Sequence, residues 1–359
     1  MHRKRWIRKI ALLLCCMILT ATFLSACKED ETDPAESGET EQTQQSADET
    51  QQTEATIAPM EVPDAADTAM TVNGEAVGTL EYRYYLTNAK AQLDQDLASY
   101  FTVNPEMTTR VIETAQYYVQ RNRAVFSLAQ KRGVSLTTAE KNEIARQTLD
   151  EMEQYGGEDI FLQALEASGM DLAFYQYQAQ VEYLEEKLLE SYIADGSITD
   201  DDATLRTLMQ GDDFILCQHI ILQPTTDAEV QEKLDLAQSI VTRLESGEDF
   251  ETLMQTYSED TLAAPEGDLF CRGFWADRAL EDACFALQVG ESSGVVKTVY
   301  GYMIVHRNDK TGYSVSDELF ASEKSDYQRA ALEQLLRTEM ATQSVNLTEV
   351  GAAVDVFSS

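Results

Sequence analysis

A nine-residue apolar run, Phe214–Leu222, interrupts a chain whose periodicity is otherwise mostly helical. The run is rich in strand-forming residues and ends just before Pro224, which has no backbone N–H to give to a sheet. We therefore predict a strand here, with helices before and after it. A chain that combines a long helical region with a separate strand-bearing unit belongs to the α+β class.

A compact unit of about 95 residues is predicted to start with this strand. Two helices come next, the first closed by Gly247, and a glycine-containing loop then leads to a third helix and two short strands. The order is β-α-α-α-β-β over residues 213–309. The predicted elements after the first strand are Asp227–Ser246, Asp249–Tyr257, Leu280–Leu287, Gly294–Lys297 and Tyr302–Arg307.

The residues before this unit predict a hairpin and a helical region. Two short strands flank Asn73-Gly74, a pair that supplies the positive φ angles of a two-residue turn. Apolar residues then recur every three or four positions, and we assign their aromatic members to the core rather than to a ligand surface. The predicted helices are Leu80–Phe101, Met107–Lys131, Thr138–Gln154 and Asp171–Ala194.

A last predicted helix, Ser314–Thr342, lies far from these helices in sequence but has an apolar face of its own. An apolar face must be covered, so we expect this helix to pack back on the N-terminal helical region. The predicted fold is therefore a strand-bearing unit inserted between N-terminal helices and a C-terminal helix.

The first 26 residues have the composition of a signal peptide. Five basic residues precede the apolar run Ile10–Phe23, which is too short to span a bilayer comfortably. The string Leu24-Ser25-Ala26-Cys27 resembles a bacterial lipobox, which implies lipidation of Cys27 and cleavage before it. An ordinary signal peptide or an uncleaved anchor stays open as the alternative.

Residues 27–65 are predicted to be a disordered acidic tether. Residues 28–65 carry twelve acidic side chains, one lysine and very few residues that could form a core. A cation-binding tail is the alternative to a plain spacer. The predicted organisation is a signal peptide at 1–26, this tether, a helical chaperone-like domain at 66–212, the strand-bearing unit at 213–309 and a C-terminal helix within 310–359.

The charge of the chain excludes some function classes. Lysine and arginine number 27 against 63 acidic residues, a formal net charge of −36. Nucleic-acid binding requires clustered basic side chains, so we expect no nucleic-acid partner. Only three histidines occur, which argues against a metal site built from histidine.

Short motifs along residues 213–309 follow the order found in one enzyme family. They are Gln218–Leu222, Gly247–Phe250, Tyr257–Asp260, Gly267–Leu269, Ala283–Leu287, Val289–Glu291 and Tyr300–Ile304. The series resembles the parvulin-type peptidyl-prolyl cis-trans isomerases. With the lipobox and the helices on either side, the whole chain resembles the PrsA-type foldase lipoproteins, although the flanking regions match only in outline.

The chemistry that this resemblance implies needs few special groups. Rotation about an X–Pro bond meets a barrier of roughly 18–20 kcal/mol from amide resonance, and no bond is broken. An apolar pocket for the prolyl ring, with polar groups that match the twisted amide, can therefore accelerate it. We expect no cofactor and no metal.

The resemblance assigns roles to particular residues. His219 matches the histidine of the first strand and Asp260 the position of a second polar site residue, so these two are the candidate catalytic residues. Leu269 matches a leucine of the apolar shelf that holds the proline. A core role for His219 and a turn-capping role for Asp260 stay open as alternatives.

Other positions depart from the family pattern. Leu280 stands where the shelf has phenylalanine, and the shelf methionine falls at Ala276 or near Trp275. Met303 replaces the histidine of the last strand, which removes a partner that would fix the tautomer of His219. His306, three residues further on, faces the opposite side of a strand and cannot replace that histidine.

Three cysteines remain after Cys27, an odd number that excludes complete pairing among themselves. A bond between Cys271 and Cys284 stays open, because geometry decides it and sequence does not. Cys217 shares a strand face with His219.

Three functions are compatible with these features. The first is a lipid-anchored isomerase on the extracytoplasmic face of the cell membrane, with unfolded or partly folded secreted polypeptides as partners. The second is a holdase chaperone with a weakly active or inactive isomerase domain, which Met303 favours. The third is a lipoprotein binding module such as a solute receptor, which the absence of two matched α/β lobes disfavours. A homodimer stays open.

Overall fold

The computed structural model describes residues 56–91, 98–261, 263–275 and 277–357. The predicted signal peptide at 1–26, the lipidation site at Cys27 and the tether up to residue 55 lie outside these residues. Residues 56–65 are described and run without regular secondary structure, and the Ala58 N–H donates to the side chain of Gln176 at 2.7 Å. The chain thus contacts the helical region before residue 65, where composition placed the end of the tether.

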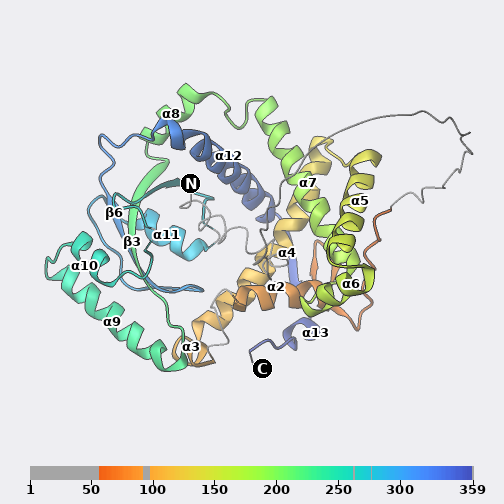
Figure 1. The fold of residues 1–359 in the computed structure, drawn as a ribbon, viewed down its shortest axis with the longest axis horizontal. Helices are drawn as coiled ribbons and strands as arrows, with labels where there is room; N and C mark the ends of the chain where they lie inside the picture. Colours follow the sequence, from red (N-terminus) through yellow and green to blue (C-terminus); the bar gives the residue numbers. More distant parts are fainter. Residues whose placement is uncertain (1–55, 92–97, 262, 276, 358–359) are drawn as a thin grey trace, which may run out of the picture.

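The structure contains helices and strands in separate regions of the chain, which confirms the α+β class (Figure 1). No helix within the described ranges is both long and apolar enough to cross a membrane. The elements are β1 (Thr68–Val72), β2 (Glu75–Gly78), α2 (Thr79–Ala91), α3 (Ala98–Val103), α4 (Glu106–Arg132), α5 (Thr138–Gln154), α6 (Glu158–Ala167), α7 (Leu172–Ala194), α8 (Asp202–Gln210), β3 (Phe214–Leu222), α9 (Asp227–Glu245), α10 (Phe250–Tyr257), β4 (Asp268–Cys271), α11 (Arg278–Ala286), β5 (Val296–Thr298), β6 (Gly301–Asn308), α12 (Asp317–Met340), β7 (Val345–Leu347) and α13 (Glu349–Ala352).

The N-terminal helices pack around α4, which crosses the middle of the molecule (Figure 1). Gly133, in the left-handed conformation with φ of 68°, ends α4, and a capping box between Thr137 and Glu140 starts α5. One core joins α2, α4, α6 and α7 through aromatic and aliphatic side chains, among them Tyr82, Phe161 and Phe174. The apolar faces predicted for α2, α4 and α7 are therefore buried, and α6, which was not predicted, joins the same core.

A small sheet closes this region, and one of its strands comes from the far end of the chain. The predicted hairpin forms around Asn73 and Gly74, whose φ angles are 52° and 83°. β7 pairs antiparallel with β1, so the sheet order is β2-β1-β7. β7 was not predicted, because a strand of three residues is too short to show a period.

The second sheet has the order β4-β3-β6-β5 with every pair antiparallel. β3, the predicted strand Phe214–Leu222, lies in the interior of this sheet, between β4 and β6. Helices α9 and α10 cover one face and α11 covers the other (Figure 1). The predicted glycine-containing loop contains β4, so the observed order is β-α-α-β-α-β-β rather than β-α-α-α-β-β.

Two elements connect the sheet unit to the N-terminal helices. α12 shares one core with α4 and α7 and another with α8, β3 and β4, which confirms that the C-terminal helix returns to the N-terminal region. α3 packs on the other side: the Tyr100 hydroxyl donates to the carbonyl of Thr298 at 2.7 Å. The predicted helix Leu80–Phe101 is described in two parts, α2 and α3, on either side of residues 92–97, and α3 joins the core beneath α9.

Candidate active site

The side-chain alternation of β3 builds one wall of the site. Cys217, His219 and Ile221 project from β3 toward α11, whereas Ile220 and Leu222 pack beneath α9 and α10. The antiparallel register places His219 opposite Val305 and Ile221 opposite Met303. Because side chains alternate along a strand, these facing pairs lie on the same side of the sheet.

His219 is paired with Asp260. The His219 Nε2 lies 2.9 Å from the Asp260 Oδ2, and the two side chains are only 12% and 6% exposed. An ionised carboxylate only accepts hydrogen bonds, so Nε2 is the donor in this contact. Asp260 therefore orients His219 and fixes its tautomer without a second imidazole.

The backbone after α10 holds Asp260 in place. The Glu259 N–H donates to the carbonyl of Ile221 at 2.9 Å, and the Ile221 N–H donates to the Ser258 hydroxyl at 3.3 Å. The Glu259 carboxylate also accepts from the N–H of Gln223 at 2.5 Å. Ser258 and Glu259 are thus bonded along the end of β3, and they place the next residue, Asp260, beside His219.

An apolar cavity lies beside His219. It is lined by Cys217, His219, Phe270, Trp275, Leu280 and Met303, with further residues of β3, β4, β6 and α11. The structure therefore brings four of the predicted site residues together: His219, Trp275, Leu280 and Met303. The cavity measures about 10 Å³, which is room for about one water molecule. A prolyl ring can enter only if a wall moves.

Leu269 does not line this cavity. It faces Leu216 in the β3–β4 register and packs with Leu205 and Phe320, on the side of the sheet that α8 and α12 cover. Phe270, the next residue, points to the cavity instead. Phe270 therefore lines the cavity where Leu269 was expected to, because adjacent residues of a strand face opposite sides. The other shelf candidate, Ala276, lies outside the described residues.

His306 lies on the opposite face from Met303, as the strand period predicts. Its ring stacks on Phe250 with centroids 4.9 Å apart, and its Nδ1 lies 2.8 Å from the Ser292 hydroxyl. Burial lowers the pKa of His306, and the nearby Asp249 only partly offsets this. His306 is therefore a packed, neutral histidine away from the cavity.

The cysteines at 217, 271 and 284 are free thiols. Cys217 and Cys284 line the cavity, whereas Cys271 packs on the other face of the sheet, which rules out the Cys271–Cys284 bond here. A hydrogen bond with Cys217 and burial raise the pKa of Cys284, and burial raises that of Cys271 to about 12. The Cys271 and Cys284 thiols therefore stay protonated, the form in which a thiol is a poor nucleophile.

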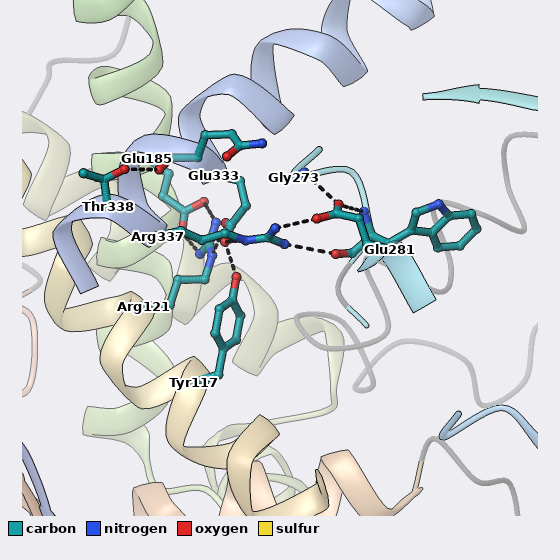
Figure 2. A network of polar contacts seen from close by, with 10 residues as sticks. Tyr117, Arg121, Glu185, Gly273, Glu281, Glu333, Arg337 and Thr338 are labelled. Carbon is teal, nitrogen blue, oxygen red and sulfur yellow. Dashed lines mark hydrogen bonds and ion pairs between the residues drawn. The ribbon is translucent and has the colours of Figure 1, made fainter. Parts of the chain in front are cut away.

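Two polar residues near the cavity, Glu281 and Arg337, could not be predicted from the sequence. Glu281, on α11, accepts from the N–H groups of Gly273 and Trp275, and Arg337 on α12 binds Glu281 (Figure 2). Both look like ordinary charged residues on amphipathic helices. Within the described ranges, no group of three or more potential metal ligands gathers anywhere.

Comparison with known proteins agrees with this geometry. Residues 219–309 match the Rotamase family, described as a PPIC-type PPIASE domain. The strand-bearing unit is therefore a parvulin-type domain.

Two curated relatives match a longer part of this chain than the family model does, and both are foldase proteins. Foldase protein PrsA of Bacillus subtilis (strain 168) is 32% identical over 167 residues, which cover 46% of this chain and 51% of that protein. Foldase protein PrsA 1 of Listeria monocytogenes serotype 4b (strain F2365) is 28% identical over 212 residues, 58% of this chain and 65% of that protein. The chain is thus PrsA-like, and the matches span between half and two thirds of these two relatives.

Solved structures of similar proteins include the crystal structure of Peptidylprolyl Isomerase (PrsA) from Bacillus anthracis. It is 22% identical and has a TM-score of 0.29, with 61% of this chain and 93% of that chain covered.

Proposed function

We propose that this protein is an extracytoplasmic foldase that catalyses cis-trans isomerisation of X–Pro bonds and assists the folding of secreted polypeptides. The observation that carries the proposal is the His219–Asp260 pair beside an apolar cavity of a parvulin-type domain. Anchoring through a lipid on Cys27, with the folded part on the outer face of the cell membrane, belongs to the same proposal and rests on the lipobox.

The site can lower the barrier by favouring the twisted amide over the planar one. A prolyl ring held against Leu280, Met303 and Phe270 would leave the amide free to rotate next to His219. A twisted amide has lost its resonance, so its oxygen and nitrogen bind hydrogen-bond partners differently from the planar form. Asp260 keeps the imidazole in one orientation, which lets it act without reorganisation during rotation.

Replacing His219 by alanine tests this role. We expect the acceleration of prolyl exchange to fall by about a hundredfold, the loss typical of removing one preorganised hydrogen-bonding group. The measurement is exchange NMR on a short Ala-Pro peptide with the chain from residue 28 onward. His306→Gln is the matched control, because His306 lies on the opposite face, and it should keep the wild-type rate. A folded His219→Ala protein with an unchanged rate would remove His219 from the mechanism.

A holdase function is the second candidate, and two observations favour it. Met303 occupies the position of the second imidazole, and the cavity has no room for a prolyl ring as it stands. In that case, the peptide resonances would shift on addition of the protein, which shows binding, without faster exchange. The same NMR experiment therefore separates the two candidates.

A further inference from the structure

The loop Gly273–Trp275 forms part of the wall of the cavity and is held from α11. The Glu281 Oε1 accepts from the Gly273 N–H at 2.7 Å and from the Trp275 N–H at 3.3 Å. The Glu281 side chain is only 2% exposed. A buried carboxylate that binds two N–H groups of one loop fixes the backbone of that loop, and with it the position of Trp275.

Arg337 completes this arrangement from outside the parvulin-type domain. Its Nη1 lies 2.7 Å from the Glu281 Oε2, and its Nη2 donates to the carbonyl of Trp275 at 3.1 Å (Figure 2). The planar guanidinium therefore contacts the carboxylate and the loop at the same time, a geometry that arginine permits and lysine does not.

Arg337 is itself held by residues of the helical region. Its Nε binds Glu333 one turn earlier on α12, and Glu333 also accepts from Arg121 at 2.8 Å and from the Tyr117 hydroxyl. Arg121 in turn pairs with Glu185 on α7 at 2.5 Å (Figure 2). A continuous set of polar contacts thus runs from α7 and α4 through α12 to the cavity loop.

The backbone of the loop also lies against α12. A Cβ added at Gly273 would lie 2.5 Å from the carbonyl oxygen of Ala330, so only glycine allows this approach. The Trp275 indole Nε1 is buried and has no hydrogen-bond partner among the described residues. The loop is therefore held firmly on the α12 side, while the buried indole N–H is an unused hydrogen-bond donor.

We propose that Arg337 is a positioning residue for the prolyl-binding cavity: from α12, it holds the Gly273–Trp275 loop and thereby places Trp275 in the cavity wall. The inference rests on the proposed function for the identity of the ligand, an X–Pro peptide. The isomerase pocket of this chain is thus completed by a helix that belongs to the helical region, and peptide binding depends on that helix.

Tryptophan fluorescence can report on the loop directly. The chain has two tryptophans, Trp6 and Trp275, so in a protein that begins at residue 28 Trp275 is the sole tryptophan. The test variant is Arg337→Met and the control is Arg329→Met. The control removes an arginine of the same helix whose ion pair with Glu186 is exposed. Arg337→Met should increase acrylamide quenching of Trp275 and lower kcat/KM for the Ala-Pro peptide about tenfold, as loss of a charged hydrogen bond does. Arg329→Met should change neither.

The change in kcat/KM should come from KM. A displaced pocket wall weakens binding of the planar and the twisted peptide alike, and such a loss raises KM while kcat stays the same. Unchanged quenching and unchanged KM in a folded Arg337→Met protein would overturn the proposal. Should that variant not fold, Arg337→Lys replaces it: it keeps the positive charge beside Glu281 but cannot reach the Trp275 carbonyl at the same time, so partial changes in both readouts are expected.

Failure of the proposed function is distinguishable from failure of this inference. If the wild-type chain does not accelerate exchange, the dissociation constant of the peptide from NMR shifts takes the place of KM, and quenching needs no activity. Weaker binding and greater quenching in Arg337→Met would then support the positioning role in a holdase. Equal binding and equal quenching would overturn it, whatever the activity of the wild type.

Discussion

Gly267→Ala should destabilise the parvulin-type domain by more than about 3 kcal/mol, beyond the cost of a strained backbone conformation alone. Gly267 has a φ of 96°, and a Cβ there would lie 2.6 Å from the carbonyl oxygen of Cys217. That carbonyl belongs to β3, two residues before His219, so the strand would have to move. The change should appear as a lower urea midpoint in Trp275 fluorescence, because Trp275 reports on this domain.

Gly247→Ala is the matched control for this prediction. Gly247 has nearly the same φ, 90°, but nothing lies within 4 Å of the added Cβ. Gly247→Ala should therefore lower the free energy of unfolding only by the cost of a left-handed backbone at a residue with a Cβ, about 1–2 kcal/mol. Equal losses in the two variants would mean that the contact with β3 contributes nothing and that the glycine of the Gly-Asp-Leu motif serves only its backbone angle.

Arg123→Met should strongly destabilise the helical region. Arg123 forms two hydrogen bonds with Glu81, at 2.9 and 2.8 Å, and the Glu81 side chain is only 2% exposed. Removing the arginine leaves a buried carboxylate without its counter-charge, a loss of about 3–5 kcal/mol near neutral pH. Thermal or urea unfolding followed by far-UV circular dichroism measures it, because this region is mostly helical.

The loss should depend on pH. Burial already raises the pKa of Glu81 above its ordinary value, although Arg123 opposes this, and without Arg123 the pKa rises further. A carboxyl group with a raised pKa in the folded state binds more protons there than in the unfolded chain. Its contribution to stability therefore falls as the pH rises from the pKa of the unfolded chain through that of the folded state. The deficit of Arg123→Met relative to wild type should thus be larger at pH 8 than at pH 5.

An exposed arginine provides the comparison. Arg146 forms ion pairs with Glu143 and Asp150 on the surface of α5, where its side chain is 59% exposed. Arg146→Met should cost less than about 1 kcal/mol at either pH. If Arg123→Met behaved like Arg146→Met, the Glu81–Arg123 pair would be no more than a surface contact.

Because Asp260 binds His219, the ring has a hydrogen-bond partner even though the second imidazole is missing. The sequence raised a doubt at Met303, because a partner that fixes the tautomer of His219 is absent there. In the structure, Asp260 binds the ring directly, and Met303 is one of the apolar residues of the cavity. The site thus has one oriented imidazole and a larger apolar surface than two imidazoles would leave.

Local patterns predicted most elements and the face that each one buries. The alternation along Phe214–Leu222 places Cys217 and His219 on one side, and the strand period separates His306 from Met303, because side-chain direction follows from the backbone of a single strand. Gly247 placed the end of α9 within a residue or two of its observed position.

The tertiary structure decided the features that depend on pairing between distant segments. Whether Leu269 or Phe270 faces the cavity depends on the register of β4 against β3, and a four-residue strand shows no period that reveals its register. The contact between Glu281 and Arg337 joins residues 56 positions apart on two helices, each of which would form without the other. Sequence by itself therefore determined the parvulin-type unit and its histidine, because those depend on local order along the chain. Only the fold decided which residues wall the cavity and which helix holds the loop, because such contacts depend on how whole elements pack.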